Sequence, residues 1–181
     1  MIEVKKIIEQ SLRDLYLNDN ILINRYTKEE SINHWLAIYI DKNIKNNLEF
    51  EYNVDVEYNR NVTDELFDRN RQINNKKIVK WSVNDITWQE IIPDIIVHKR
   101  GSNENNYLCI EVKKEYQSRK SANVDLQKII GLLNKPFDYK YGCIIEYKPE
   151  DEYFEVTIIR KVRQEYESEL FFVEKILPTL Q

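Results

Sequence analysis

Apolar residues recur at the period of an amphipathic helix in the first part of the chain. Between Ile2 and Leu17 they fall at positions 4, 7, 8, 12 and 15, which is the spacing of one buried helix face. A second helix is expected to begin at Thr27, because threonine is a favoured N-cap and two acidic residues follow in the first turn. The apolar stripe of this second helix consists of Ile32, Trp35, Leu36, Tyr39 and Ile40.

From Glu51 onward the period changes to two. Tyr52, Val54, Val56 and Tyr58 alternate with polar residues, which predicts a strand with one buried face. A polar, turn-rich stretch at 60–77 predicts a surface loop or an extended hairpin. Five more strands are predicted, at 78–83, 91–98, 107–113, 141–148 and 153–160. Two more helices are predicted, at 121–134 and at about 165–177, each followed by a proline.

This order of elements predicts an α/β fold with a mixed β-sheet flanked by α-helices. The 181 residues fit a single domain, and only three glycines and four prolines occur, so no interdomain linker is evident. We expect a core at about 27–148, with the helices at 2–17 and about 165–177 appended to it.

Composition excludes several classes of protein. A charged fraction of 32% and a hydrophobic fraction of 42% are typical neither of a disordered tail nor of a membrane protein. The longest apolar run is too short to span a bilayer, and the first residues lack the apolar core of a signal peptide. Cys109 and Cys143 lie in apolar runs without a Cys/His cluster, which argues against structural zinc and a disulfide scaffold. We therefore expect a cytoplasmic protein with no membrane partner and two core cysteines.

The distribution of charge is uneven along the chain. The net charge of −4, from 27 basic and 31 acidic residues, argues against a non-specific nucleic-acid binder. Between Arg60 and Lys128, however, 13 basic residues stand against 10 acidic ones, whereas the remainder carries 14 against 21. This pattern is compatible with a local groove that faces phosphates, and equally with an ordinary mixed surface.

Two neighbouring strands carry the residues with chemical potential. An ionised aspartate in an apolar strand is costly to bury unless it is paired or bound to a metal, and Asp94 lies in such a strand directly after Pro93. In the next strand, the alternation of side chains directs Glu111 and Lys113 to the same face. The opposite face of that strand carries Leu108, Ile110 and Val112.

A hairpin would bring the carboxylates together. If the two strands pair around the 99–106 loop, residues whose numbers sum to about 205 face each other, so Asp94 lies opposite Glu111. Two facing carboxylates repel unless a proton or a cation lies between them, and such oxygen ligands suit Mg²⁺ or Mn²⁺. The alternative is that Asp94 is a turn residue and that Glu111 and Lys113 form an ion pair on one face.

The Pro93-Asp94 pair, followed by Glu111-Val112-Lys113, resembles the signature of the PD-(D/E)xK nuclease superfamily. The resemblance covers about residues 27–148. The stretch 29–40 and the segments VEYNRN, PDIIVHKRG and IEVKK are similar to a family of small uncharacterised bacterial proteins in this superfamily. It implies a restriction-endonuclease-like fold and a Mg²⁺- or Mn²⁺-dependent endonuclease that acts on DNA.

The resemblance also implies a role for each matching residue. Asp94 and Glu111 would bind the cation directly, together with the backbone carbonyl of Val112. Lys113 would orient or deprotonate the attacking water and stabilise charge at the phosphate. An acidic residue of the preceding helix often completes the set of metal ligands.

For that acidic residue we choose Glu29, because its spacing to the apolar stripe directs it toward the core, with Glu30 as the alternative. In the competing interpretation, Glu29 only complements the dipole of its helix.

Other residues are weaker candidates for substrate binding. Lys114 and Lys128 are candidates for phosphate contacts, although Lys128 and Asp125 are spaced to form a pair on a helix surface. His34 is a further candidate, and the alternative is that His34 and His98 are ordinary, partly buried histidines.

Two expectations about partners follow from the implied function. Cleavage of both strands of DNA usually needs two active sites, which implies a homodimer or a partner subunit. The alternative function is a silent or weakly active restriction-endonuclease-like module that binds DNA or a partner protein. The acidic net charge favours this alternative, whereas the complete set of Asp94, Glu111 and Lys113 argues against it.

Overall fold

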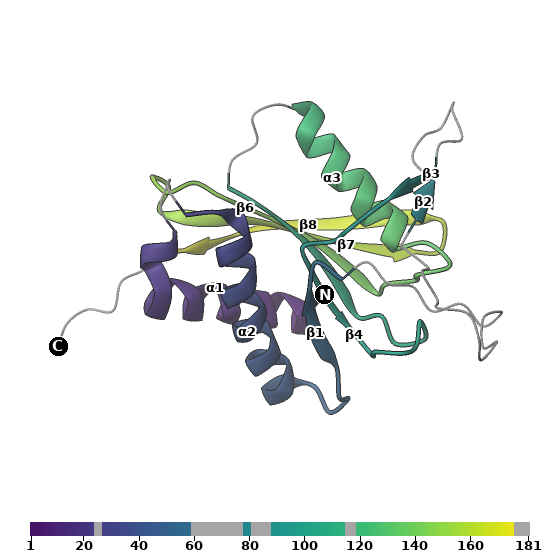
Figure 1. Ribbon diagram of the computed structural model, residues 1–181, viewed down its shortest axis with the longest axis horizontal. Coiled ribbons are helices and arrows are strands. Elements are labelled where there is room, and N and C mark those ends of the chain that lie inside the picture. The colour runs from purple at the N-terminus through teal and green to yellow at the C-terminus, as the bar shows by residue number, and fades with distance from the viewer. Residues whose placement is uncertain (24–26, 59–77, 81–87, 115–118, 176–181) are drawn as a thin grey trace, which may run out of the picture.

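The computed structural model describes residues 1–23, 27–58, 78–80, 88–114 and 119–175 (Figure 1). Three α-helices, a short 3₁₀ helix and eight strands occur in this part of the chain. In chain order they are α1 (Ile2–Asp19), η1 (Asn20–Leu22), α2 (Glu29–Asn47), β1 (Asn53–Val56), β2 (Ile78–Lys80), β3 (Trp88–Glu90), β4 (Ile95–His98), β5 (Leu108–Lys113), α3 (Arg119–Leu132), β6 (Tyr141–Tyr147), β7 (Tyr153–Val162) and β8 (Glu165–Glu174).

Six of the strands form one mixed sheet. Their order is β1-β4-β5-β6-β7-β8, and β2 and β3 form a separate antiparallel pair. The β5–β6 pair is parallel and the other neighbours in the large sheet are antiparallel. A parallel pair needs a crossover connection, and α3 provides it. The predicted α/β class, with a mixed sheet flanked by helices, is confirmed at this level.

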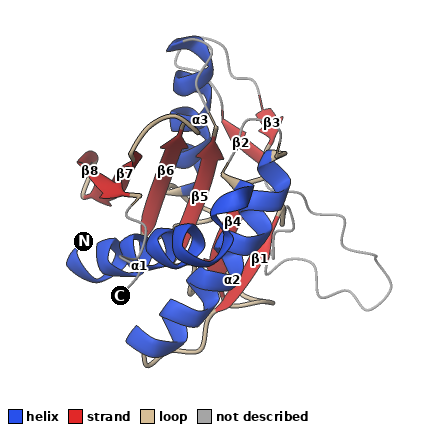
Figure 2. Cartoon of the chain, turned by 90° about the vertical axis from the view of Figure 1, so that its left-hand side faces the viewer, coloured by secondary structure: helices blue, strands red, loops and turns tan. Residues whose placement is uncertain are grey.

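Helices cover both faces of the sheet. The helices α1 and α2 lie on one face and α3 lies on the other (Figures 1 and 2). The larger core cluster joins α1 and α2 to the sheet, and the smaller one joins α3 to the opposite face. The alternation predicted for β5 is confirmed, because Leu108, Ile110 and Val112 belong to the larger cluster and Cys109 to the smaller.

The first helix is part of the core and not an appendage to it. All its inward apolar side chains are at most 1% exposed, and they pack with those of α2 and the sheet. The second helix begins at Glu29, with Lys28 at the N-cap, so Thr27 is not the cap. Trp35 was expected in the apolar stripe of this helix but is 39% exposed.

The prediction of a last helix at about 165–177 is wrong. Residues 165–174 form β8, which pairs with β7 along ten residue pairs across a tight turn at Arg163 and Gln164. Arg163 adopts a positive φ of 59°, as such hairpin turns require. The buried residues of β8, Phe171 and Val173, follow a period of two, and their burial outweighs the helix propensity of the surrounding glutamates.

Other boundaries differ from the sequence prediction by a few residues. The strand predicted at 91–98 begins only at Ile95, and β3 was not predicted. Of the strand predicted at 78–83, the structure describes 78–80 as β2. The predicted loop at 60–77 lies outside the described residues.

Two expectations from composition can be compared with the structure. Cys109 and Cys143 are both buried, as predicted for two core cysteines. None of the described helices combines the length and apolar character that crossing a membrane requires.

Candidate functional site

The predicted hairpin register is confirmed. Ile95 pairs with Ile110, and the next pairs along β4 and β5 keep the same sum of 205. Asp94 immediately precedes β4, where the backbone bends after Pro93. The register therefore brings Asp94 to the level of Glu111, on the face of the sheet that α3 covers.

Glu111 is a fully buried carboxylate in the middle of the sheet. Its Oε2 accepts a hydrogen bond from the ammonium of Lys128 at 2.9 Å, whereas Oε1 has no hydrogen-bond partner among the described residues. Burial, followed by the negative charge of Asp94, raises the pKa of Glu111 to about 8, and Lys128 acts in the opposite direction. The ionised form of Glu111 is thus disfavoured unless a proton or a further cation neutralises it.

Asp94 is fixed by the backbone of the neighbouring strand. Its Oδ2 accepts a hydrogen bond from the N–H of Val112 at 2.7 Å. Burial raises the pKa of Asp94, although the bond to Val112 and the charge of Lys113 oppose this shift. Because the N–H and C=O of one strand residue point toward the same side, the carbonyl of Val112 is directed toward the Asp94 side of β5.

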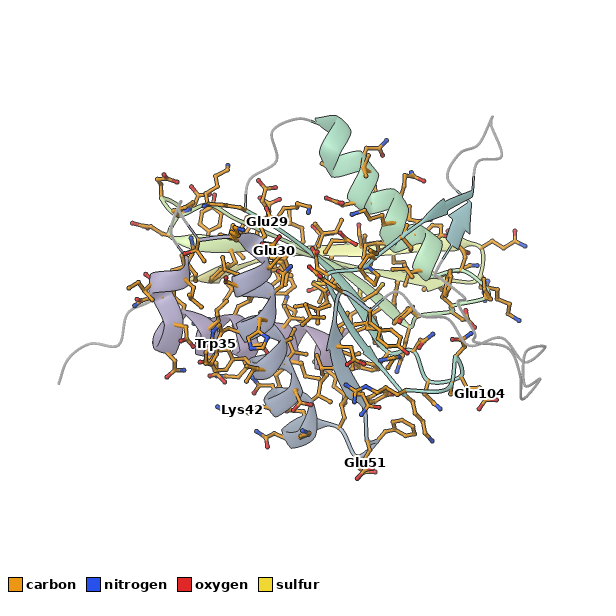
Figure 3. All side chains as sticks on the ribbon, viewed as in Figure 1. Glu29, Glu30, Trp35, Lys42, Glu51 and Glu104 are labelled. Carbon is orange, nitrogen blue, oxygen red and sulfur yellow. The ribbon has the colours of Figure 1, made fainter. Side chains whose placement is uncertain are left out.

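Lys113 and Glu29 meet at the end of β5. The Nζ of Lys113 lies 3.6 Å from Oε2 of Glu29, and Oε1 of Glu29 accepts a hydrogen bond from the backbone N–H of Lys114 at 3.1 Å. Figure 3 shows Glu29 and Glu30 at the start of α2. The contacts to β5 come from Glu29, whereas the side chain of Glu30 is exposed. The structure thus brings Glu29 to the motif, as the sequence predicted.

Lys113 is held in its charged form. Burial alone would lower its pKa, but the surrounding carboxylates outweigh this effect and raise it. An ammonium with a raised pKa is suited to stabilise negative charge and is a poor proton acceptor. The carboxylates that act on Lys113 are Asp94, Asp125, Glu29 and Glu111.

Lys128 and Asp125 lie beside the motif, closer to it than the sequence indicates. Lys128 was a weak candidate for phosphate contacts, and its pairing with Asp125 was expected on a helix surface. The pair exists, with Nζ of Lys128 2.8 Å from Oδ1 of Asp125, but the Asp125 side chain is only 4% exposed. It faces the sheet because Asp125, Ile129 and Leu132 follow one helix face, and this spacing could have indicated its burial.

The two histidines have other surroundings. His34 lies exposed on α2, where its ring packs edge-on against Trp35, and no contact links it to the carboxylates among the described residues. His98 is buried at the other end of β4, with Nε2 2.8 Å from Oδ2 of Asp55, which Arg100 also contacts. His98 therefore belongs to a separate polar cluster at the β1 edge of the sheet.

A cavity of about 410 Å³ lies beside the site, between α3 and the strands β6 and β7. It is lined by apolar residues, by Asn123 and Thr157, and by the carboxylates of Glu146 and Glu155. Glu146 is the β6 partner of Lys113. Two carboxylates make this cavity unsuitable for a phosphate group. A larger cavity of about 660 Å³, beside β1 and Arg100, contains none of the predicted site residues.

The donor set fits a divalent cation in its chemistry. Asp94, Glu111 and Glu29 supply carboxylate oxygens, the ligands that Mg²⁺ and Mn²⁺ prefer. The unpaired, buried Oε1 of Glu111 is an acceptor that a cation would satisfy. Within the described ranges, no three His, Cys, Asp or Glu side chains are already arranged around one point as a metal site.

No protein-family model, no curated protein and no solved structure matches this chain. A function must therefore be inferred from the residues of the site and from their geometry.

Proposed function

We propose that the protein is a divalent-metal-dependent nuclease of restriction-endonuclease-like fold that hydrolyses phosphodiester bonds, with DNA as its substrate. The observation that carries this proposal is the buried Glu111, which has one unpaired oxygen and lies next to Asp94. A buried carboxylate raises the free energy of the folded protein unless a proton or a cation compensates it. Among the described residues, the Lys128 ammonium bonds to Oε2 of Glu111 and leaves Oε1 without a partner. A function that needs the cation explains why this cost is retained.

Some residues of the site would bind the cation and others would stabilise the phosphate. Asp94 and Glu111 would hold the Mg²⁺ or Mn²⁺, with Glu29 and the carbonyl of Val112 as further oxygen donors. The bound cation would supply a water of lowered pKa and would offset negative charge at the phosphorus. Lys113, held as an ammonium, would stabilise the charge that develops on the phosphate oxygens.

The choice of DNA as the substrate is based on the resemblance of the motif to the PD-(D/E)xK nuclease signature and not on a recognition surface. The same resemblance favours a homodimer or a partner subunit for cleavage of both strands. Lys114, directly after β5, would supply positive charge for phosphates, whereas the ammonium of Lys128 is engaged by Glu111 and Asp125.

The experiment compares cleavage of a supercoiled plasmid and of single-stranded and duplex oligonucleotides with Mg²⁺, Mn²⁺ or EDTA. Cleavage should require the metal and should be lost in Asp94→Asn, which keeps an acceptor for the N–H of Val112. Asp41→Asn is the matched control, because Asp41 forms a surface ion pair with Lys45. In parallel, Mn²⁺ should raise the melting temperature of the parent and of the control but not of Asp94→Asn. Equal metal responses in all three proteins would contradict the proposal.

A second candidate function is a binding module that retains the fold with little cutting. The observation that favours it is the ion pair between Lys128 and Glu111, which gives this carboxylate a cation from the protein itself. This alternative predicts DNA retention in a gel-shift assay without metal-dependent cleavage or a metal-dependent thermal shift.

A further inference from the structure

One ammonium group lies between two buried carboxylates beneath α3. The Nζ of Lys128 is 2.9 Å from Oε2 of Glu111 and 2.8 Å from Oδ1 of Asp125. The exposed fractions of the Glu111 and Asp125 side chains are 1% and 4%, so little water reaches either carboxylate. Both bonds are short and charge-assisted, and they fix Lys128 between β5 and its own helix.

In the metal-free protein, the ammonium of Lys128 is the group that neutralises the charge of Glu111. The other ammonium of the site, Lys113, is directed to Glu29, with a separation of 3.6 Å. Among the described residues, the bond to Lys128 is also the one hydrogen bond that Glu111 accepts. Removing Lys128 would therefore leave two buried carboxylates without their hydrogen-bonded ammonium, which is destabilising.

The same arrangement places a positive charge where a metal ion would bind. A cation bound to Glu111 and Asp94 would lie within a few ångströms of the Lys128 ammonium. Like charges at such a separation repel even at the permittivity of water, and they repel more strongly in a buried site. Lys128 must then either move from Glu111 or weaken the binding of the metal.

We propose that Lys128 is a built-in counter-cation that stabilises the metal-free site and competes with the divalent cation for Glu111. This inference rests on the proposed metal-dependent function and adds a regulatory role within the same site. The competition limits metal affinity, so that the site fills only when the free metal is abundant. After the metal binds, Asp125 still holds the ammonium at the edge of the site.

The test combines three variants. Lys128→Gln removes the charge but can still donate a hydrogen bond, Lys128→Arg keeps the charge, and Lys45→Gln removes an exposed lysine far from the site. Calorimetric titration with Mn²⁺ should show about tenfold or tighter binding by Lys128→Gln than by the parent. Lys128→Arg and Lys45→Gln should bind as the parent does. Equal or weaker binding by Lys128→Gln, in a parent that binds Mn²⁺, overturns the inference and leaves the proposed function intact.

A measurement in EDTA separates the two proposals. In metal-free buffer, Lys128→Gln should melt below the parent, and the loss should be much smaller when Glu111→Gln is already present. Equal losses in both backgrounds overturn the role of Lys128 as a counter-cation. If neither the parent nor Lys128→Gln binds Mn²⁺, the proposed function and the competition fail together, and the coupling in EDTA alone decides the counter-cation role.

One further outcome concerns folding. If Lys128→Gln is unfolded in EDTA, circular dichroism should show that Mn²⁺ restores its native spectrum. Failure of Mn²⁺ to restore that spectrum overturns the inference.

Discussion

Gly142 allows α3 to pack closely on β6, and its replacement by alanine tests this contact. A β-carbon at position 142 would lie 2.2 Å from Cγ2 of Ile129, far inside a normal contact distance. Cγ2 can move away only by rotation about the Cα–Cβ bond of Ile129, and a β-branched residue in a helix strongly prefers one such rotamer. Relief of the contact therefore requires either a disfavoured rotamer or a shift of the helix. The other two near atoms, Cβ and Cδ1 of Ile129, would be at acceptable distances of 3.5 and 3.7 Å.

Gly142→Ala should lower the free energy of unfolding, whereas a glycine-to-alanine substitution usually raises it where the backbone allows alanine. Replacing glycine by alanine where the backbone allows it stabilises a protein by about 0.4–1 kcal/mol through the unfolded state. Overpacking a core costs about 1–3 kcal/mol, so Gly142→Ala should lose about 1–2 kcal/mol net. For a chain of this size, the melting temperature should fall by about 2–8 °C.

A double-mutant cycle identifies the clash. Ile129→Leu removes the Cγ2 branch at nearly constant volume, so Gly142→Ala should cost little in that background. Gly101→Ala is the control, because Gly101 has a φ of 78° but no atom within 4 Å of the added carbon, and its cost should not depend on Ile129. A stabilising Gly142→Ala, or an equal loss in both backgrounds, would refute the close contact of α3 with β6.

Two further predictions concern a charge at the site and a charge remote from it. Lys113→Gln should keep the Mn²⁺-dependent thermal shift but should cleave about 10²-fold or more slowly than the parent. The control, Lys45→Gln, should cleave as the parent does. If Lys113→Gln cleaves as fast as the parent, Lys113 has no role in catalysis. Hydrogen bonds and charge from Arg100, and next from His98, lower the pKa of Asp55, although burial acts in the opposite direction. Asp55 therefore contributes its full stability above its unfolded pKa near 4, and this contribution is lost as the pH falls through its lower folded pKa. The difference in melting temperature between the parent and Asp55→Asn should therefore shrink between about pH 5 and pH 3, and a constant difference would contradict this role.

The part of the site carried by β4 and β5 could be predicted from the sequence because it depends on local geometry. Symmetric antiparallel pairing around the connecting loop fixes which residues face each other, and the alternation of a strand fixes the face of each side chain. The sum of 205 and the shared face of Glu111 and Lys113 follow from these two rules alone. Glu29 could be predicted because the apolar stripe of its helix defines the direction of the first turn.

The end of the chain could not be predicted in the same way. The segment 165–174 contains four glutamates and a leucine, which favour a helix in an isolated peptide. Its apolar residues 170–173 are consecutive, so neither period is clear at this point. Pairing with β7 decides the outcome, since it buries Phe171 and Val173 against the larger core. Tertiary contacts thus override local propensity here.

The role of Lys128 depends on a distance that no local pattern contains. Its ammonium reaches Glu111 only because α3 packs closely on the sheet, and the missing side chain of Gly142 permits this approach at Ile129. The helix position of Lys128 could be predicted from the sequence, but the depth of the helix on the sheet is set by the crossover between β5 and β6. A change at the Gly142 contact should therefore alter more than stability. If α3 moves outward in Gly142→Ala, Glu111 loses part of its counter-ion, and Mn²⁺ should bind more tightly to this variant than to the parent.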